Sequence, residues 1–129
     1  MGDLDELRRF FDDYGKALAD VDLAGIAGCY RVPALVLSDA GAVAFSANDE
    51  VEAFYADRVQ HYHGRGIVAA RPSLRSHTTL SRQLLTVDVT WAFLDGEGVT
   101  LDQESYRYVL RMTEDEGPQI QVVIATAPA

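Results

Sequence analysis

The C-terminal third of the chain alternates between apolar and polar residues with a period of two. Three such segments, residues 85–93, 106–112 and 120–124, follow one another. This alternation is typical of strands that bury one face only. Turn-forming residues at 95–98 and 114–118 separate the three segments. The pattern therefore predicts an antiparallel meander whose apolar face must be covered by other elements.

The first half of the chain supplies that cover, because its apolar residues recur at helical spacing. The stripe from Leu4 to Leu18 predicts a first helix, within which Gly15 indicates a close contact with another element. Asp22 caps a second, shorter helix, and Pro33 ends it because proline lacks the amide proton that a helix needs.

A third helix begins at Ser46 or Asn48 and ends at the glycines of residues 64–66. Before it, residues 34–38 and 43–45 predict a small hairpin, and after it, residues 67–70 and 74–80 are weaker strand candidates around Pro72. The inner stripe of this third helix consists of Val51, Phe54, Tyr55, Arg58 or Val59, and Tyr62. The pattern thus predicts one domain over residues 1–129, with three helices, a hairpin among them and a long antiparallel sheet.

Composition and charge limit the partners. The 129 residues carry a net charge of −9, so general binding to nucleic acid or to an anionic membrane is not expected. No apolar run approaches the roughly 20 residues of a membrane span, and the N-terminus lacks the apolar core of a signal peptide. The single cysteine, Cys29, rules out an internal disulfide framework and fits a reducing compartment. We therefore predict a cytoplasmic protein.

Several local patterns accompany this order of elements: Tyr14–Leu18 followed by Asp22–Ile26, then Val36–Asp39, Val87–Trp91, Tyr108–Met112 and Ile120–Val122. Together with the order of elements, these patterns resemble the nuclear transport factor 2-like superfamily. The superfamily includes ketosteroid isomerases, scytalone dehydratases and polyketide cyclases. The resemblance implies a cone-shaped α+β fold in which three N-terminal helices pack on a strongly curved antiparallel sheet. It also implies a pocket between helices and sheet, and a homodimer formed through the sheets.

The ketosteroid isomerase branch offers the most specific comparison. Its chemistry needs a carboxylate base and two hydrogen-bond donors that face a developing oxyanion. The resemblance puts Tyr14 at one donor position and Tyr108 at the other, and it puts Ser38 at the position of the base. Asp39 lies one residue beyond, and a shift of one residue in a strand turns a side chain to the opposite face. The resemblance therefore implies two donors with an absent or displaced base, unless Asp39 turns into the pocket. In the alternative interpretation, both tyrosines simply pack their rings in the core.

Other candidate groups lie between residues 58 and 82. His61 and His63 do not share a helix face, and no nearby acid completes a ligand set with His77, so no metal site or cofactor is predicted. A histidine as general base is chemically reasonable, because its pKa lies near neutrality. The same interval has no acid and contains five arginines, which indicates an anion-accepting mouth, an intermolecular contact or a solvated face: Arg58, Arg65, Arg71, Arg75 and Arg82.

Three hypotheses follow. In the first, the protein binds a small apolar or carboxylate-bearing molecule in a pocket lined by Tyr14, Tyr30, Phe54, Trp91 and Tyr108. The second is an isomerase, dehydratase or cyclase that uses Asp39 or a histidine as base and the tyrosines as donors. In the third, the chain is a dimeric interaction domain with a closed interior.

Overall fold

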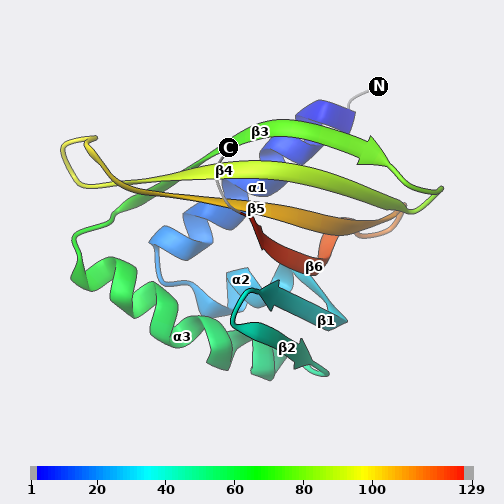
Figure 1. Ribbon diagram of the computed structural model, residues 1–129, viewed down its shortest axis with the longest axis horizontal. Coiled ribbons are helices and arrows are strands. Elements are labelled where there is room, and N and C mark those ends of the chain that lie inside the picture. Colours follow the sequence, from blue (N-terminus) through cyan, green and yellow to red (C-terminus); the bar gives the residue numbers. More distant parts are fainter. Residues whose placement is uncertain (1–2, 127–129) are drawn as a thin grey trace.

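The computed structural model describes residues 3–126 and contains three helices and six strands (Figure 1). The helices are α1 (Asp3–Ala19), α2 (Leu23–Gly28) and α3 (Asn48–Gly64). The strands are β1 (Tyr30–Ser38), β2 (Gly41–Phe45), β3 (Ala69–Thr79), β4 (Leu84–Leu94), β5 (Thr100–Thr113) and β6 (Gly117–Thr126). The α+β class, the three helices and the meander of the last three strands are confirmed.

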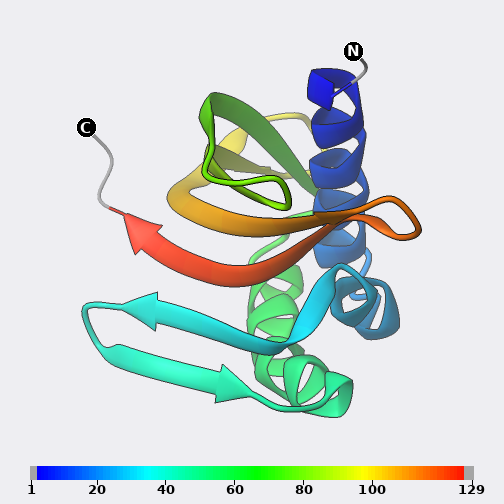
Figure 2. The same ribbon diagram turned by 90° about the vertical axis from the view of Figure 1, so that its right-hand side faces the viewer.

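The six strands form one sheet in the order β2-β1-β6-β5-β4-β3. Strands β3 to β6 are antiparallel neighbours, as predicted, but β1 pairs with β6 in parallel, with Leu35 opposite Val122 and Leu37 opposite Ile124. The sheet is therefore mixed rather than purely antiparallel. It twists from strand to strand but is not strongly curled, which corrects the strongly curved sheet that the resemblance implied (Figure 2).

The helices cover one face and one end of this sheet. Figure 1 shows α1 passing behind the long strands β3 to β5, and α3 lying beside the β1–β2 hairpin. In Figure 2, α1 stands along one side of the sheet, while α2, α3 and the hairpin form the lower end. The buried cluster that joins the layers draws on α1, α3 and the inner faces of β4 and β5, with Phe11, Val51, Trp91 and Leu110 almost fully buried. No helix within residues 3–126 is long and apolar enough to cross a membrane.

Local chemistry explains where elements begin and end. Asp22 caps α2 as predicted, because its carboxylate accepts a hydrogen bond from the Gly25 amide at 3.0 Å. The second helix ends at Gly28, earlier than Pro33 predicted, and Pro33 lies inside β1 instead. The two weak strand candidates around Pro72 are one continuous strand, β3. Pro72 is tolerated there because β3 is an edge strand, where a missing amide proton breaks no inner ladder.

Candidate functional site

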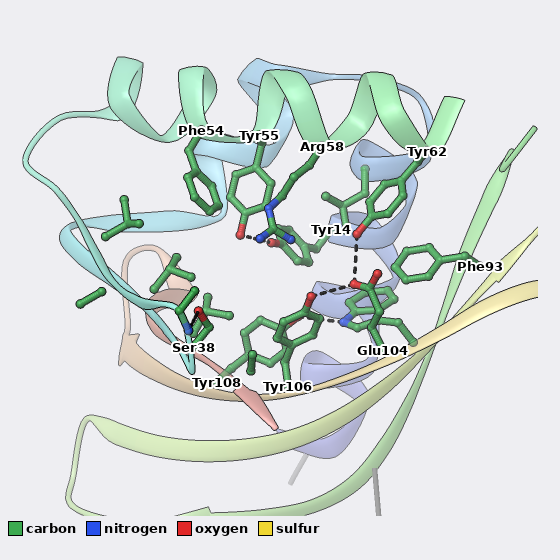
Figure 3. Close-up of a pocket in the computed structure, with 18 of the residues that line it drawn as sticks. Tyr14, Ser38, Phe54, Tyr55, Arg58, Tyr62, Phe93, Glu104, Tyr106 and Tyr108 are labelled. Carbon is green, nitrogen blue, oxygen red and sulfur yellow. Dashed lines mark hydrogen bonds between the residues drawn. The ribbon is translucent and has the colours of Figure 1, made fainter. Parts of the chain in front are cut away.

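A cavity of about 300 Å³ lies between α1, α3, the β1–β2 hairpin and the inner faces of β4 to β6 (Figure 3). Its walls are largely aromatic and aliphatic. The cavity is lined by Tyr14, Leu18, Val36, Ser38, Ala40, Gly41, Ala42, Val43, Phe54, Tyr55, Arg58, Tyr62, Trp91, Phe93, Glu104, Tyr106, Tyr108, Val123 and Ala125. Helix and sheet thus enclose a hollow of ligand size with a few polar groups converging on it.

Three tyrosine hydroxyls meet at one end of this cavity. The Tyr14 hydroxyl lies 2.7 Å from that of Tyr30 and donates to that of Tyr55 at 3.3 Å, and the hydroxyls of Tyr30 and Tyr55 lie 2.5 Å apart. Burial raises the pKa of all three phenols above their ordinary value, and for Tyr14 and Tyr30 well above it. They therefore remain neutral, so they act as hydrogen-bond donors rather than as anions.

Apart from these three hydroxyls, a pair of polar groups lies on the floor of the cavity. The indole nitrogen of Trp91 on β4 donates to the hydroxyl oxygen of Tyr108 on β5 at 2.8 Å. Burial raises the pKa of Tyr108 well above its ordinary value, so the phenol keeps its proton. That proton has no acceptor among the hydrogen bonds that join the described residues, so it is available to a molecule in the cavity.

Glu104 is the one acidic residue among those that line the cavity. Its Oε1 accepts hydrogen bonds from the hydroxyl of Tyr106 at 2.7 Å and from that of Tyr62 on α3 at 3.1 Å (Figure 3). Burial is the largest cause that raises the pKa of Tyr62, and the negative charge of Glu104 is the next. Burial is also the largest cause that raises the pKa of Tyr106, and its hydrogen bond to Glu104 is the next. Both phenols therefore stay protonated and continue to donate to Glu104.

Arg58 reaches the cavity from α3, opposite the sheet (Figure 3). Its guanidinium carbon lies 5.0 Å from the centre of the Phe54 ring, which is within the range of a cation–π contact. Partial burial opposes the charged form, but the nearby phenols of Tyr106, Tyr55 and Tyr62 outweigh it and raise the pKa of Arg58. The cavity therefore contains a permanent positive charge.

The structure brings together some of the predicted site residues and not others. Tyr14, Phe54, Trp91 and Tyr108 line the cavity. Tyr30 does not line it; its hydroxyl lies behind those of Tyr14 and Tyr55 and fixes the position of both.

The expected bases are not at the cavity. Asp39 is exposed in the turn between β1 and β2 and is not among the lining residues, whereas its neighbour Ser38 is. His61, His63 and His77 are all exposed and do not line the cavity. The enzyme hypothesis in its expected form therefore lacks its base there. Within residues 3–126, no group of three His, Cys, Asp or Glu side chains is arranged to hold a metal ion.

The five arginines of residues 58–82 do not converge. Arg58 alone lines the cavity, and Arg65 pairs with Asp102 at 3.2 Å. Arg71 and Arg75 are exposed on the edge strand β3, and Arg82 is exposed in the turn that follows it. A common anion-accepting mouth is therefore not formed by this stretch, and its contribution to the cavity is a single guanidinium.

Sequence reasoning missed Glu104 and gave little weight to Tyr55, Tyr62 and Tyr106. The signal for Glu104 was present, because it precedes Tyr106 by two residues and so extends the same strand face. On α3, residues 55, 58 and 62 share a helix face. If the inner face of α3 is packed against the inner face of β5, these residues meet at the polar end of the cavity.

A comparison with protein families decides where this chain belongs. Residues 5–128 match the family described as NTF2-like protein (DUF6841). The chain belongs to this family of NTF2-like proteins. The match covers all the helices from early α1 and all six strands, which agrees with the resemblance seen in the sequence. No curated protein matches the NTF2-like chain at a significant level.

Solved structures confirm the fold of this NTF2-like protein. A Nostoc punctiforme domain of unknown function with a cystatin-like fold has a TM-score of 0.77 and 18% identity, covering 100% of this chain and 79% of that one. An NTF2-like protein of unknown function from Shewanella oneidensis has a TM-score of 0.70 and 14% identity, and the match covers 96% of this chain and 98% of that one. An NTF2-like superfamily protein from Salmonella enterica has a TM-score of 0.65 and 14% identity, and the match covers 97% of this chain and 90% of that one. At such identities the likeness establishes the fold alone.

Proposed function

We propose that this NTF2-like protein binds a small, largely apolar molecule in the cavity between its helices and its sheet. The observation that carries the proposal is a hollow of about 300 Å³ with aromatic walls and few, convergent polar groups. Sites for small molecules commonly have this composition. We also propose that binding takes place in the cytoplasm, a location with which the single cysteine agrees.

The polar groups indicate which end of the ligand they hold. Tyr108 has an uncommitted hydroxyl proton, whereas the protons of Tyr14, Tyr30 and Tyr55 are shared among their own three hydroxyls. Neutral phenols donate to carbonyl or carboxylate oxygens. We therefore expect ligands with an oxygen acceptor at one end, such as ketones and organic acids.

Ligand binding is testable by thermal stabilisation. We expect at least one compound from a panel of apolar ketones and hydrophobic carboxylic acids to raise the melting temperature. A ligand present at 100 times its Kd stabilises the folded state by about 2.7 kcal/mol, which raises the melting temperature of a domain of this size by about 10 °C. Differential scanning calorimetry measures the shift directly.

A matched pair of variants shows whether the stabilisation comes from the cavity. Val43 and Ala44 are neighbours on β2 and are both exposed, but they face opposite sides of the sheet. Val43 lies opposite Val36 and lines the cavity with it, whereas Ala44 lies opposite Leu35 and does not line the cavity. We expect Val43→Trp to abolish the shift and Ala44→Trp to preserve it. Equal shifts in both variants, or no shift with any compound in the unaltered protein, would contradict the proposal.

We further propose that two copies of the chain associate through the outer face of the sheet. Val36 and Val123 line the cavity, so their strand neighbours face the opposite side. There the register joins half-buried apolar residues into one patch: Leu35, Leu37, Val109, Val122 and Ile124.

The polar groups beside this patch are hydrogen-bonded within the chain. Arg107 pairs with Asp88 at 2.7 Å, and Arg111 donates to the neutral amide oxygen of Gln121 at 2.8 Å. A second copy of the same face would therefore meet an apolar centre whose polar neighbours already have hydrogen-bond partners, as suits a two-fold interface.

The oligomeric state tests this association. We expect sedimentation velocity to give a dimer for the unaltered protein and a monomer for Val122→Arg, because an arginine in the centre of the patch would be buried without a partner. Val99→Arg is the control, since Val99 is 55% exposed in the turn between β4 and β5. A monomeric unaltered protein, or a dimer that survives Val122→Arg, would exclude this interface.

A further inference from the structure

Two side chains of opposite charge line the same cavity without pairing. Arg58 enters from α3 and Glu104 from β5. Among the described residues, no Asp or Glu oxygen lies within 4.0 Å of the Arg58 guanidinium, although five ion pairs form elsewhere on the same part of the chain. Arg58 and Glu104 therefore face one space but remain separate.

This separation is unusual for two charges between apolar walls. Opposite charges attract more strongly when little water lies between them, and a partly desolvated charge without a partner is unfavourable. The side chains of Arg58 and Glu104 are both long and flexible, so in an empty cavity the simplest way to satisfy both charges would be a direct ion pair. A molecule with complementary groups at its two ends would satisfy both charges at once.

The Arg58 end is suited to a carboxylate. A guanidinium presents its donors in a planar fork that matches the two oxygens of a carboxylate. The Phe54 ring, 5.0 Å from the guanidinium carbon, supports the side chain from one side. Since no protein carboxylate occupies the fork among the described residues, the fork can bind an anion in the cavity beside the Tyr106 hydroxyl, which also interacts with the guanidinium.

The Glu104 end is suited to a hydroxyl. Its Oε1 already accepts from two phenols, those of Tyr62 and Tyr106. Its Oε2 has no hydrogen bond to any described residue and is not among their buried unpartnered atoms, so it is accessible. A carboxylate accepts about four hydrogen bonds, so Glu104 has room for a further donor of the kind it already binds.

The walls between the two ends are aromatic. Rings from Tyr14, Phe54, Tyr55, Trp91 and Phe93 surround the space. Aromatic rings pack favourably against other rings in offset or edge-to-face arrangements.

We propose that Arg58 and Glu104 select an aromatic acid with two polar ends, its carboxylate bound by Arg58 and its ring hydroxyl donating to Glu104. This inference rests on the proposed binding function and specifies the ligand class for the same cavity. It assigns Arg58 and Glu104 as the residues that determine specificity and orientation.

The test uses small hydroxyaromatic acids of increasing length: 4-hydroxybenzoate, 4-hydroxyphenylacetate and 3-(4-hydroxyphenyl)propanoate. Each is compared with an analogue that lacks the hydroxyl and with one that lacks the carboxylate. Isothermal titration calorimetry gives the affinities. Trp91, the single tryptophan of the chain, lines the cavity, so its fluorescence reports whether each compound binds there.

We expect the best of the three acids to lose about tenfold in affinity when either group is removed, because a hydrogen bond to a charged group contributes about 1.5–3 kcal/mol, or roughly tenfold or more in Kd. The losses should be specific to each end. In Glu104→Gln the hydroxyl should no longer matter, and in Arg58→Gln the carboxylate should no longer matter. Glu97→Gln and Arg71→Gln, which change exposed residues outside the cavity, should leave both preferences intact.

The outcomes separate this inference from the proposed function. If the analogues lacking hydroxyl or carboxylate bind the unaltered protein within twofold of their parents, the two-ended selection is wrong, while binding in the cavity stands. If neither these acids nor any apolar ketone changes the fluorescence or releases heat, both proposals fail. The analogue series uses the unaltered protein, so it decides the question even if a variant does not fold.

Discussion

Gly15→Ala is expected to destabilise the protein by about 2–3 kcal/mol, although alanine is the better helix former by about 1 kcal/mol. A Cβ at this position in α1 would lie 2.7 Å from the carbonyl oxygen of Ala70 on β3 and 2.7 Å from the Trp91 ring on β4. Neither neighbour moves freely, because one is backbone and the other belongs to the buried core. We expect the melting temperature to fall by about 10 °C, measured by calorimetry.

Gly28→Ala is the matched control for this effect. Gly28 is also a helical glycine, at the end of α2, but nothing lies within 4 Å of the position its Cβ would take. We expect this variant to be as stable as the unaltered protein or slightly more stable. If Gly15→Ala behaves in the same way, the close approach of α1 to the sheet does not limit this position.

A sharp alkaline unfolding transition is the second large effect that we expect. All six tyrosines of the chain have pKa values raised above 10.0, with burial as the largest cause in each case. In the unfolded chain these phenols return to ordinary values and ionise near pH 10. The folded protein thus holds protons that the unfolded chain releases.

The direction of the effect follows from proton linkage. The stability due to these phenols is fully present below the unfolded pKa of about 10 and is lost as the pH rises from there towards the folded values. Each phenol contributes up to about 1.4 kcal/mol per pH unit in this range, so six acting together reach about 8 kcal/mol per unit. Because small domains are stable by about 5–15 kcal/mol, unfolding should be complete within about two units above pH 10.

Far-ultraviolet circular dichroism and the absorbance of tyrosinate, followed through the same titration, measure this transition. We expect the two signals to change together, because the buried phenols lose their protons only when the chain unfolds. A gradual rise of tyrosinate absorbance near pH 10 with unchanged dichroism would contradict the prediction, because it would mean that the phenols ionise within the folded protein.

The fold could be predicted because its local patterns are strong. The alternation in residues 84–126 marks the meander, and the stripe from Leu4 to Leu18 marks α1. The parallel pairing of β1 with β6 could not be predicted, since alternation shows which face of a strand is buried but not which strand lies beside it. The gradual twist of the sheet is likewise a property of the whole assembly of strands.

The candidate site was only partly predictable for a related reason. Tyr14 and Tyr108 line the cavity because each lies on the apolar stripe of its element, which a sequence displays. Glu104 lies on the same face of β5, but a charged residue ordinarily marks the solvent side of a strand. Only its phenolic partners, which come from distant parts of the chain, explain why it is oriented inwards.

The parallel pairing of β1 with β6 has a consequence for the order in which the protein assembles during synthesis. The hairpin of β1 and β2 is synthesised before the other strands of the sheet, but β6, the neighbour that holds β1 in the sheet, is synthesised after them. Val123 and Ala125 of β6 also complete the wall of the cavity. Contacts between such distant segments form slowly, so the backbone amide and carbonyl groups on one edge of β1 stay unpaired until β6 has been made. The free edge of β1 is therefore exposed during the interval between translation of β2 and translation of β6.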